Sequence, residues 1–495
     1  MRLEELATLM VGAVIEGNPD AEITGIETDS RKVRRGDLFI CLPGAVHDGH
    51  DYAAQAVAAG AAALVVSRPV GVKADIIRVK DTRLAMAVMA NHFYRYPSHE
   101  LKLIGITGTN GKTTVSYMIE KILEDQGRST GLMGTIRMKI AGRSYDVKNT
   151  TQEALELQRN FRAMRDSGAE YCVMEVSSHA LDMGRVKGCR FRTAVFTNLT
   201  QDHLDYHHTM EQYKQAKGLL FSRLGNTYSA HPDERQYAVL NADDEASEYF
   251  ASLTAAQVVT YGIERPADVR AEEVRISPDG ARFRVTSFAG SCDFRLRLTG
   301  KFSVYNALAA VSAGLLEGIR LSEIRDSLES MEGVEGRFEL IREGQDFLVI
   351  VDYAHTPDSL ENVLATISEF AEGRILCVFG CGGDRDRTKR PVMGEIAARY
   401  SDVVIITSDN PRSEDPERIL FDIEEGVRRA GMDSDSYEKI VDRKQAIHKA
   451  VAMAEPKDVV LIAGKGHETY QEIGGVRIDF DDREVARQAI RSRFI

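Results

Sequence analysis

The sequence has no tryptophan, only six cysteines and twelve prolines among 495 residues, and no long uninterrupted apolar run. The most apolar stretch, residues 53–66, is short and rich in alanine, whereas a membrane span needs about 20 apolar residues. The amino-terminal segment carries acidic residues early and its apolar stretch is too short for an export signal. We therefore expect a cytoplasmic protein that does not insert into a membrane.

The cysteines are scattered and fall mostly within predicted strands, which favours buried thiols in a reducing compartment over disulfides. Cys377 and Cys381 form a C-x3-C pair without a second pair, which does not favour a zinc site.

An excess of positive charge is also missing. The chain has 63 basic and 75 acidic residues, a net charge of −12, which argues against a general nucleic-acid-binding protein. With 43% hydrophobic and 28% charged residues the composition is that of a globular protein, and the length predicts about three domains.

Strand and helix patterns alternate along the whole chain, which predicts an α/β protein. The first domain, residues 1–98, has predicted strands and helices at 23–29, 36–42, 52–59, 62–67, 75–80 and 84–94. The second, residues 99–333, has a strand at 101–108, a helix at 112–125, further strands at 171–178 and 193–200, a β-rich section around 274–288 and a helix at 304–317. The third, residues 334–495, has strands at 348–354, 374–380, 402–409 and 458–464. Fully apolar strands separated by helices are typical of parallel sheets, so we expect a parallel central domain and a Rossmann-like carboxy-terminal domain.

A phosphate-binding loop joins the first strand of the central domain to its helix. It consists of Gly108, Thr109, Asn110, Gly111, Lys112, Thr113 and Thr114. Glycines allow successive N–H groups to face phosphate oxygens, Lys112 can reach the terminal phosphates, and Thr113 can bind Mg²⁺. Ile106 stands where the usual pattern has its first glycine. By itself the loop would suit a kinase, a GTPase or a ligase.

Six further motifs occur in order: EVSSHAL (175–181), TNLTQDHLDYH (197–207), YNALAA (305–310), GRFE (336–339), DYAHTPDSL (352–360) and GCGGDRDRTKRP (380–391). Together with the loop they resemble the Mur ligases and the related folylpolyglutamate synthetase. DNPR (409–412) and GKGHE (464–468) resemble the branch of the family that adds meso-diaminopimelate.

The resemblance implies three catalytic or metal-binding positions besides Lys112 and Thr113. Glu175 follows a buried strand, where a carboxylate suits Mg²⁺, and His203 matches the position of a second Mg²⁺. Lys217 matches a lysine that is carbamylated by CO₂ and so becomes a metal-positioning anion, although its own sequence context predicts a surface helix lysine. His207, His208 and His355 receive no firm role, and the first two are interpreted as partly exposed.

Substrate positions follow from the same resemblance. Those that match ATP contacts are the loop residues with Asn306, Arg337 and Asp352. Those that match the UDP-sugar-dipeptide site are Thr28, Ser30, Ala45, Val46, His47, Asn149, Thr150, Thr151, Ser177 and Arg185. Those that match the diaminopimelate site are Arg385, Asp409, Asn410, Pro411, Arg412, Gly464 and Glu468. An arginine can bind the distal carboxylate with two hydrogen bonds, and a glutamate can accept from an ammonium group.

The implied activity is ATP- and Mg²⁺-dependent addition of meso-diaminopimelate to UDP-N-acetylmuramoyl-L-alanyl-D-glutamate through an acyl phosphate, carried out by a monomer. Within the family, folylpolyglutamate synthesis and lysine addition are the alternatives. Outside it, the alternatives are a non-catalytic nucleotide switch and a small-molecule kinase. A switch would not release ADP in response to the acceptor, and a kinase would form a phosphorylated product and no amide.

Overall fold

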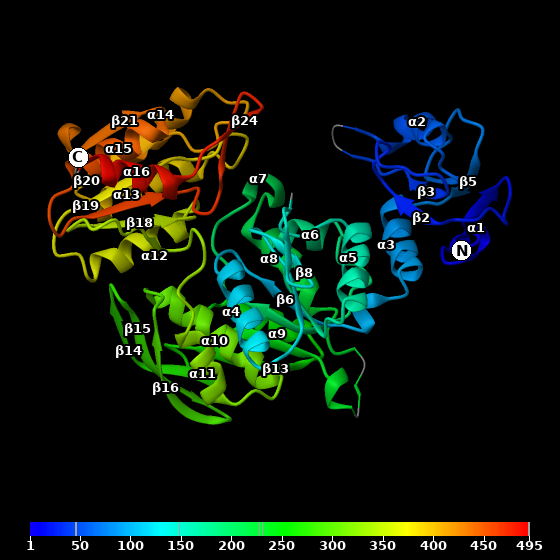
Figure 1. Cartoon of the computed structure of the whole chain (residues 1–495), viewed down its shortest axis with the longest axis horizontal. Coiled ribbons are helices and arrows are strands. Elements are labelled where there is room, and N and C mark those ends of the chain that lie inside the picture. The colour runs from blue at the N-terminus through cyan, green and yellow to red at the C-terminus, as the bar shows by residue number, and fades with distance from the viewer. Residues whose placement is uncertain (45–46, 148, 227, 230, 494–495) are drawn as a thin grey trace. The chain divides into compact units, whose positions relative to one another are not determined.

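The computed structural model describes residues 1–44, 47–147, 149–226, 228–229 and 231–493 (Figure 1). The chain forms two compact units. Unit 1 comprises residues 1–106, 127–194 and 223–236, and unit 2 comprises residues 107–126, 195–222 and 237–495. In the described part of the chain, no helix is both long and apolar enough to cross a membrane.

Unit 1 begins with a five-stranded sheet in the order β1-β5-β4-β3-β2. Its elements are α1 (Leu3–Ala7), β1 (Val14–Glu16), β2 (Gly25–Glu27), β3 (Asp37–Ile40), α2 (Ala53–Ala58), β4 (Ala63–Val66), β5 (Asp75–Arg78) and α3 (Thr82–Phe93). β2 to β5 pair in parallel, and only β1 at the edge is antiparallel. The sequence predicted every element here except α1 and β1.

The rest of unit 1 contains β6 (Lys102–Thr107), β7 (Thr130–Met133), β8 (Met138–Ile140), β9 (Arg143–Tyr145), α5 (Ala154–Asp166), β10 (Tyr171–Glu175) and α6 (Ser178–Asp182). β10 pairs in parallel with β6 and β7, so all three strands end at the same edge of the sheet. That edge is where an open parallel sheet places its ligands.

Unit 2 begins at Thr107, with the phosphate-binding loop and the helix that follows it. Its elements up to residue 330 include α4 (Lys112–Asp125), the end of β11 (Phe191–Phe196), α7 (Leu204–His207), α8 (Met210–Phe221), β12 (Tyr237–Asn241), α9 (Ala246–Leu253), β13 (Gln257–Gly262), β14 (Val269–Ser277), β15 (Gly280–Ser287), β16 (Gly290–Leu296), α10 (Lys301–Leu316) and α11 (Leu321–Glu329). The predicted β-rich section is the antiparallel ribbon β14-β15-β16. α4 spans the predicted residues, and α10 begins three residues earlier than predicted.

The carboxy-terminal part of unit 2, coloured yellow to red in Figure 1, is a doubly wound sheet in the order β17-β18-β22-β19-β20-β21. Its elements are β17 (Glu339–Leu340), β18 (Leu348–Asp352), α12 (Pro357–Ser368), β19 (Ile375–Phe379), α13 (Lys389–Tyr400), β20 (Val403–Thr407), α14 (Pro416–Arg429), β21 (Tyr437–Ile440), α15 (Arg443–Met453), β22 (Val459–Ala463), the hairpin β23 (Tyr470–Ile473) and β24 (Val476–Asp479), and α16 (Asp482–Arg493). Side chains of α12, α13 and α14 form one core with the sheet, and those of α15 and α16 form a second. Helices therefore cover both faces, as the apolar strands predicted.

A buried ion pair joins α15 to α16 behind the carboxyl ends of β20 and β22. Arg443 contacts Asp482 through two nitrogens, at 2.8 and 2.7 Å, and both side chains are fully buried. Arg443 also donates to the carbonyl oxygens of Ser408 and Ala463. This arginine thus fixes the two strand ends from which the segments 409–412 and 464–468 extend.

We expect Arg443→Ala to lower the free energy of unfolding by about 3–5 kcal/mol, because Asp482 would remain buried without its partner. Lys449→Ala is the matched control on α15, since Lys449 forms an exposed ion pair with Glu438 and should contribute less than about 1 kcal/mol. Urea unfolding of both variants measures the difference. Equal midpoints for the two variants would contradict the assigned role of the buried pair.

Candidate active site

The phosphate-binding loop is a tight turn between β6 and α4. Gly108 and Gly111 have φ values of +146° and +86°, which favour glycine. A Cβ atom at Gly111 would collide with Oδ1 of Asn306, and one at Gly108 would collide with Oγ1 of Thr197. The N–H groups of Thr109 and Asn110 donate to Asn198, and α4 begins at Lys112, where the first N–H groups of a helix have no partner within it. The sequence thus forms the turn that its pattern predicted.

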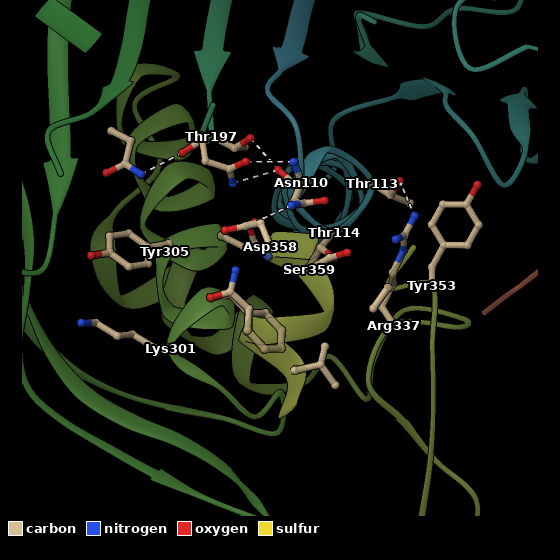
Figure 2. A pocket seen from close by; sticks show the side chains of 18 of the residues that line it. Asn110, Thr113, Thr114, Thr197, Lys301, Tyr305, Arg337, Tyr353, Asp358 and Ser359 are labelled. Carbon is tan, nitrogen blue, oxygen red and sulfur yellow. Dashed lines mark hydrogen bonds between the residues drawn. The ribbon is translucent and has the colours of Figure 1, made fainter. Parts of the chain in front are cut away.

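A cavity of about 320 Å³ opens beside this loop (Figure 2). The predicted ATP residues that line it are Asn110, Gly111, Thr113, Thr114, Asn306, Arg337 and Asp352. Other lining residues, which the sequence did not single out, include Asp243, Lys301, Phe302, Tyr305, Tyr353 and Asp358. One cavity therefore brings together residues from five segments of the chain, within 110–114, 197–198, 241–261, 301–306 and 337–363.

Two hydrogen bonds tie the loop to the carboxy-terminal part of unit 2. Arg337 Nη2 donates to Thr113 Oγ1 at 3.2 Å, and Asn110 Nδ2 donates to Asp358 Oδ2 at 2.7 Å, as the dashed lines in Figure 2 show. Arg337 also stacks over the ring of Tyr353 at 4.4 Å. Burial raises the pKa of Asp358, although hydrogen bonds from Asn110 and others oppose that rise.

Asp352 supports the same region from the end of β18. It is buried, and it accepts a hydrogen bond from the backbone N–H of Phe338 at 2.6 Å. Burial raises its pKa, and the nearby charge of Arg337 opposes that rise. Asp352 therefore holds the turn on which Arg337 stands.

Two lysines meet at the loop carbonyls. Lys112 donates to the oxygens of Gly108 and Thr109 at 3.0 and 2.7 Å, and Lys217 donates to that of Gly108 at 2.8 Å. Lys217 is only 1% exposed and lies 4.3 Å from the centre of the Tyr213 ring. Burial, reinforced by the charge of Lys112, lowers the pKa of Lys217 well below its usual value. The interpretation of Lys217 as a surface lysine is wrong, because residues more than a hundred positions away cover it.

His203 stands at the start of α7 in a left-handed conformation, with φ of +56°. Its Nε2 lies 3.3 Å from Oδ2 of the buried Asp202. Burial favours the neutral acid, but nearby positive charge, chiefly from His203 and Lys389, holds the pKa of Asp202 at about 2. Asp202 is therefore ionised at neutral pH, and it orients His203.

The neighbouring histidines differ from one another. His207 is buried and its ring lies 5.2 Å from that of Tyr213, so the prediction of a partly exposed residue is wrong for His207. His355 packs on Tyr353 with ring centres 4.5 Å apart, and its Nδ1 lies 2.8 Å from the carbonyl oxygen of Tyr353. Burial and the charge of Lys389 lower the pKa of His355 to about 4, which keeps it neutral.

The predicted diaminopimelate residues also gather in unit 2. Asn410 is 2% exposed and donates through Nδ2 to Glu468 Oε2 at 2.9 Å. Lys465 is fully buried and donates to both side chains, at 3.1 and 2.9 Å. Arg412 is half-buried and donates to the carbonyl of Gly383 at 2.7 Å. Lys465 thus joins Asn410 to Glu468, and Arg412 lies two residues after Asn410 in the same loop.

The other four members of this predicted set are Arg385, Asp409, Pro411 and Gly464, of which Pro411 is buried. Asp409 lies at the end of β20, where its backbone oxygen accepts from Gln471. The charges of Lys465 and Arg443 outweigh the effect of burial and lower its pKa. A Cβ atom at Gly464 would contact Oδ2 of Asp409 at 2.6 Å. Arg385 is exposed and donates to the carbonyl of Asp384 at 2.8 Å.

In unit 1, Thr151, Ser177 and Arg185 of the predicted muramoyl-dipeptide residues form one hydrogen-bond network. Thr151 Oγ1 donates to the Glu175 carbonyl at 2.9 Å and accepts from the backbone N–H of Ser177 at 3.0 Å. Arg185 donates to the Thr151 carbonyl at 2.9 Å and forms an ion pair with Glu153 at 2.9 Å. The Glu175 carboxylate is buried, and it accepts from the backbone and the hydroxyl of Thr135.

Of the predicted uridine-site residues, Thr28 and Ser30 follow β2 and His47 follows β3 in the amino-terminal part of unit 1. Ser30 Oγ donates to Gln55 Oε1 at 3.0 Å, the backbone N–H of Thr28 donates to Glu27 at 2.9 Å, and His47 Nδ1 lies 3.2 Å from the hydroxyl of Tyr52. Ala45 and Val46 lie outside the described residues.

Known proteins and family profiles match this chain over most or all of its length. Three segments match profiles described as "Mur ligase family, catalytic domain" (22–94), "Mur ligase middle domain" (106–314) and "Mur ligase, glutamate ligase domain" (336–466). Relatives from Halalkalibacterium halodurans and Bacillus cereus are 56% and 52% identical over 97% and 100% of this chain, and over 96% and 99% of their own lengths. Both are named UDP-N-acetylmuramoyl-L-alanyl-D-glutamate--2,6-diaminopimelate ligase.

A solved structure with the same enzyme name is 35% identical in sequence. The match spans 100% of this chain and 99% of the chain in that structure, and the two superpose with a TM-score of 0.69. The predicted three-part α/β fold is thereby confirmed. The chain belongs to the Mur ligase family.

Proposed function

We propose that the chain is a cytoplasmic, ATP-dependent ligase that joins meso-diaminopimelate to the D-glutamyl γ-carboxylate of UDP-N-acetylmuramoyl-L-alanyl-D-glutamate. The names of relatives that match over their full length support this assignment. The observation that carries it is the cluster of Asn410, Arg412 and Glu468, since its cation and carboxylate suit the distal carboxylate and ammonium of diaminopimelate.

ATP is proposed to bind in the cavity beside the loop. Lys112 belongs to the loop and Arg337 donates to the hydroxyl of Thr113, so both can stabilise the charge that develops on the transferred phosphoryl group. Asn306 and Tyr305 line the cavity with polar groups that can hold the nucleoside.

The residues proposed to hold Mg²⁺ are Thr113, Glu175 and His203. Hydroxyl and carboxylate oxygens are the donors that this hard cation prefers, so Thr113 and Glu175 fit it. When bound, Mg²⁺ would neutralise phosphate charge. Lys217, as a carbamate, is the fourth proposed member of this set, and its buried, low-pKa amine suits reaction with CO₂.

The proposed reaction has two steps. The γ-carboxylate of the D-glutamyl residue attacks the γ-phosphorus of ATP, which forms an acyl phosphate and releases ADP. The neutral amine of diaminopimelate then attacks the acyl carbon, and inorganic phosphate leaves as the amide forms. No protein nucleophile is required.

The remaining proposed roles follow the predicted division into residues 1–98, 99–333 and 334–495. Thr28, Ser30 and His47 would hold the uridine diphosphate, and the network around Thr151 and Arg185 would hold the muramoyl dipeptide.

The test is ADP release with the UDP-dipeptide, ATP and either meso-diaminopimelate or L-lysine. We expect the wild type to respond to diaminopimelate only. Arg412→Ala should raise the KM for diaminopimelate about 10- to 100-fold, because a charge-assisted pair of hydrogen bonds is lost. Arg429→Ala, an exposed arginine at the end of α14, is the matched control.

Three other outcomes would count against parts of the proposal. Equal use of L-lysine would contradict the selectivity, and an unchanged KM in Arg412→Ala would contradict the role of that arginine. Absence of ADP release with either amine would contradict the proposed acceptors and direct the search to folate-type substrates.

A further inference from the structure

Two loops at the carboxyl ends of neighbouring strands carry the arginines proposed to bind the acceptor. β19 and β20 pair in parallel. The loop after β19 contains Arg385, and the loop after β20 contains Arg412. The distance between the two guanidinium groups therefore depends on how these loops are held against each other.

Backbone contacts join the loops at their bases. The N–H of Gly383 donates to the carbonyl of Asn410 at 2.9 Å, and Arg412 Nη1 donates back to the carbonyl of Gly383. A Cβ atom at Gly383 would collide with the carbonyl oxygen of Pro411. The close approach of the loops thus requires glycine at this position.

One side-chain pair joins the loops further out. Ser413 Oγ donates to Asp384 Oδ1 at 2.7 Å, and the backbone N–H of Ser413 points to Asp384 Oδ2 at 3.2 Å. Asp384 directly precedes Arg385, and Ser413 directly follows Arg412. Asp384 and Arg412 both have left-handed backbones, with φ of +53° and +52°. Side chains other than glycine adopt this conformation only where surrounding contacts hold it.

A buried cation supports the pair from behind. Arg390 is fully buried and forms ion pairs with Glu414 and Asp422 at 2.8 and 2.9 Å. Glu414 also accepts from the backbone N–H of Asp384 at 2.7 Å. The charged side chains beneath the two loops are therefore paired with one another. The outer contact between Asp384 and Ser413 is the one that a single substitution can remove without breaking these buried pairs.

We infer that Asp384 and Ser413 form a clasp that sets the spacing of Arg385 and Arg412 and thereby determines affinity for an acceptor with a second carboxylate. Both are positioning residues, since they act through the arginines. This inference rests on the proposed diaminopimelate-adding function, and it assigns selectivity to two residues outside the predicted site.

The test compares Ser413→Ala, which removes the hydroxyl, with Ser413→Thr, which keeps it. Ser368→Ala is the matched control, because Ser368 is an exposed serine on α12 whose hydroxyl contacts only its own helix among the described residues. Ser413→Ala should raise the KM for diaminopimelate about tenfold, as expected for the loss of a hydrogen bond to a charged group. Its kcat, its KM for ATP and its melting temperature should stay close to wild type, and Ser413→Thr should restore the KM.

Several results would overturn the inference. An unchanged KM for diaminopimelate in Ser413→Ala would do so, as would a parallel rise in the KM for ATP, which indicates a general structural role. Failure of Ser413→Thr to restore the KM would also do so. If the wild type releases no ADP with diaminopimelate, both the proposed function and this inference are contradicted. If the wild type turns over normally and Ser413→Ala is unaffected, only the role of the clasp is contradicted.

Discussion

Replacing Lys112 by alanine is expected to lower kcat by about 10²–10³-fold, the range found when one group that stabilises transition-state charge is removed. Lys112 is bonded to its own loop, with Nζ on the carbonyls of Gly108 and Thr109. Phosphate oxygens carry negative charge, so they are stronger partners for this ammonium group than the neutral carbonyls are. The transferred phosphoryl group would gain most from this cation, which is why the effect falls on kcat.

The matched control is Lys121→Ala on the same helix. Lys121 forms a partly exposed pair with Asp125 near the end of α4, at 2.9 Å, so its loss should change kcat less than twofold. Steady-state ADP release with saturating acceptor measures both variants. A Lys112→Ala enzyme that keeps its kcat and only raises the KM for ATP would show that the lysine binds ground state and transition state equally.

The architecture was largely predictable because its main strands are buried on both faces. Runs such as residues 348–352 and 459–463 are apolar throughout and are flanked by amphipathic helices, and such runs have few alternatives to a parallel sheet. The elements missed include α1, β1, β7, β12, β13, β17, β21 and the β23–β24 hairpin. Of these, β1, β17 and β21 are short and lie at sheet edges, where one partner strand suffices and polar residues are tolerated.

Burial of single polar side chains was much less predictable. Lys217 reads as a surface residue on α8, yet the loop at Gly108 and the ring of Tyr213 enclose it. The local pattern of apolar and polar residues on α8 cannot show that the loop at Gly108, 109 residues earlier in the chain, buries this side chain. Family resemblance identified the position, and only the fold explains the unusual chemistry of its amine.

The residues that support the site were missed for a related reason. Asp358 and Lys465 stand inside motifs quoted from the sequence, but nothing local distinguishes them from capping or surface charges. Their partners are Asn110 for the first, and Asn410 with Glu468 for the second. Such pairings join loops at different strand ends, so they follow from the strand order of the sheet and not from spacing along the chain.

Lys217 leads to the second large effect. Burial and the neighbouring Lys112 lower its pKa well below the usual value, so its amine is more readily neutral than an exposed lysine at neutral pH. A neutral amine reacts with CO₂, and the carbamate that results is an anion beside the cation of Lys112. As an ammonium group, by contrast, Lys217 would place a second positive charge in a fully buried site.

Lys217→Ala and Lys217→Arg are both expected to lower kcat about 100-fold or more, the order found when one preorganised charge is removed from an active site. Arginine keeps a positive charge but cannot be carbamylated, so it separates the two possible forms of the residue. Lys214→Ala is the control, because Lys214 lies on the same helix in a partly exposed pair with Glu211 and should leave kcat unchanged.

Depletion of CO₂ provides the independent readout. Wild-type activity should fall when CO₂ is stripped at constant pH and return with bicarbonate, whereas the residual activity of Lys217→Ala should not respond. Because the amine reacts only when deprotonated, the bicarbonate requirement should increase as the pH is lowered through the pKa of Lys217. An active Lys217→Arg enzyme, or a wild type indifferent to CO₂, would instead assign Lys217 the role of a cation that holds the loop carbonyl of Gly108.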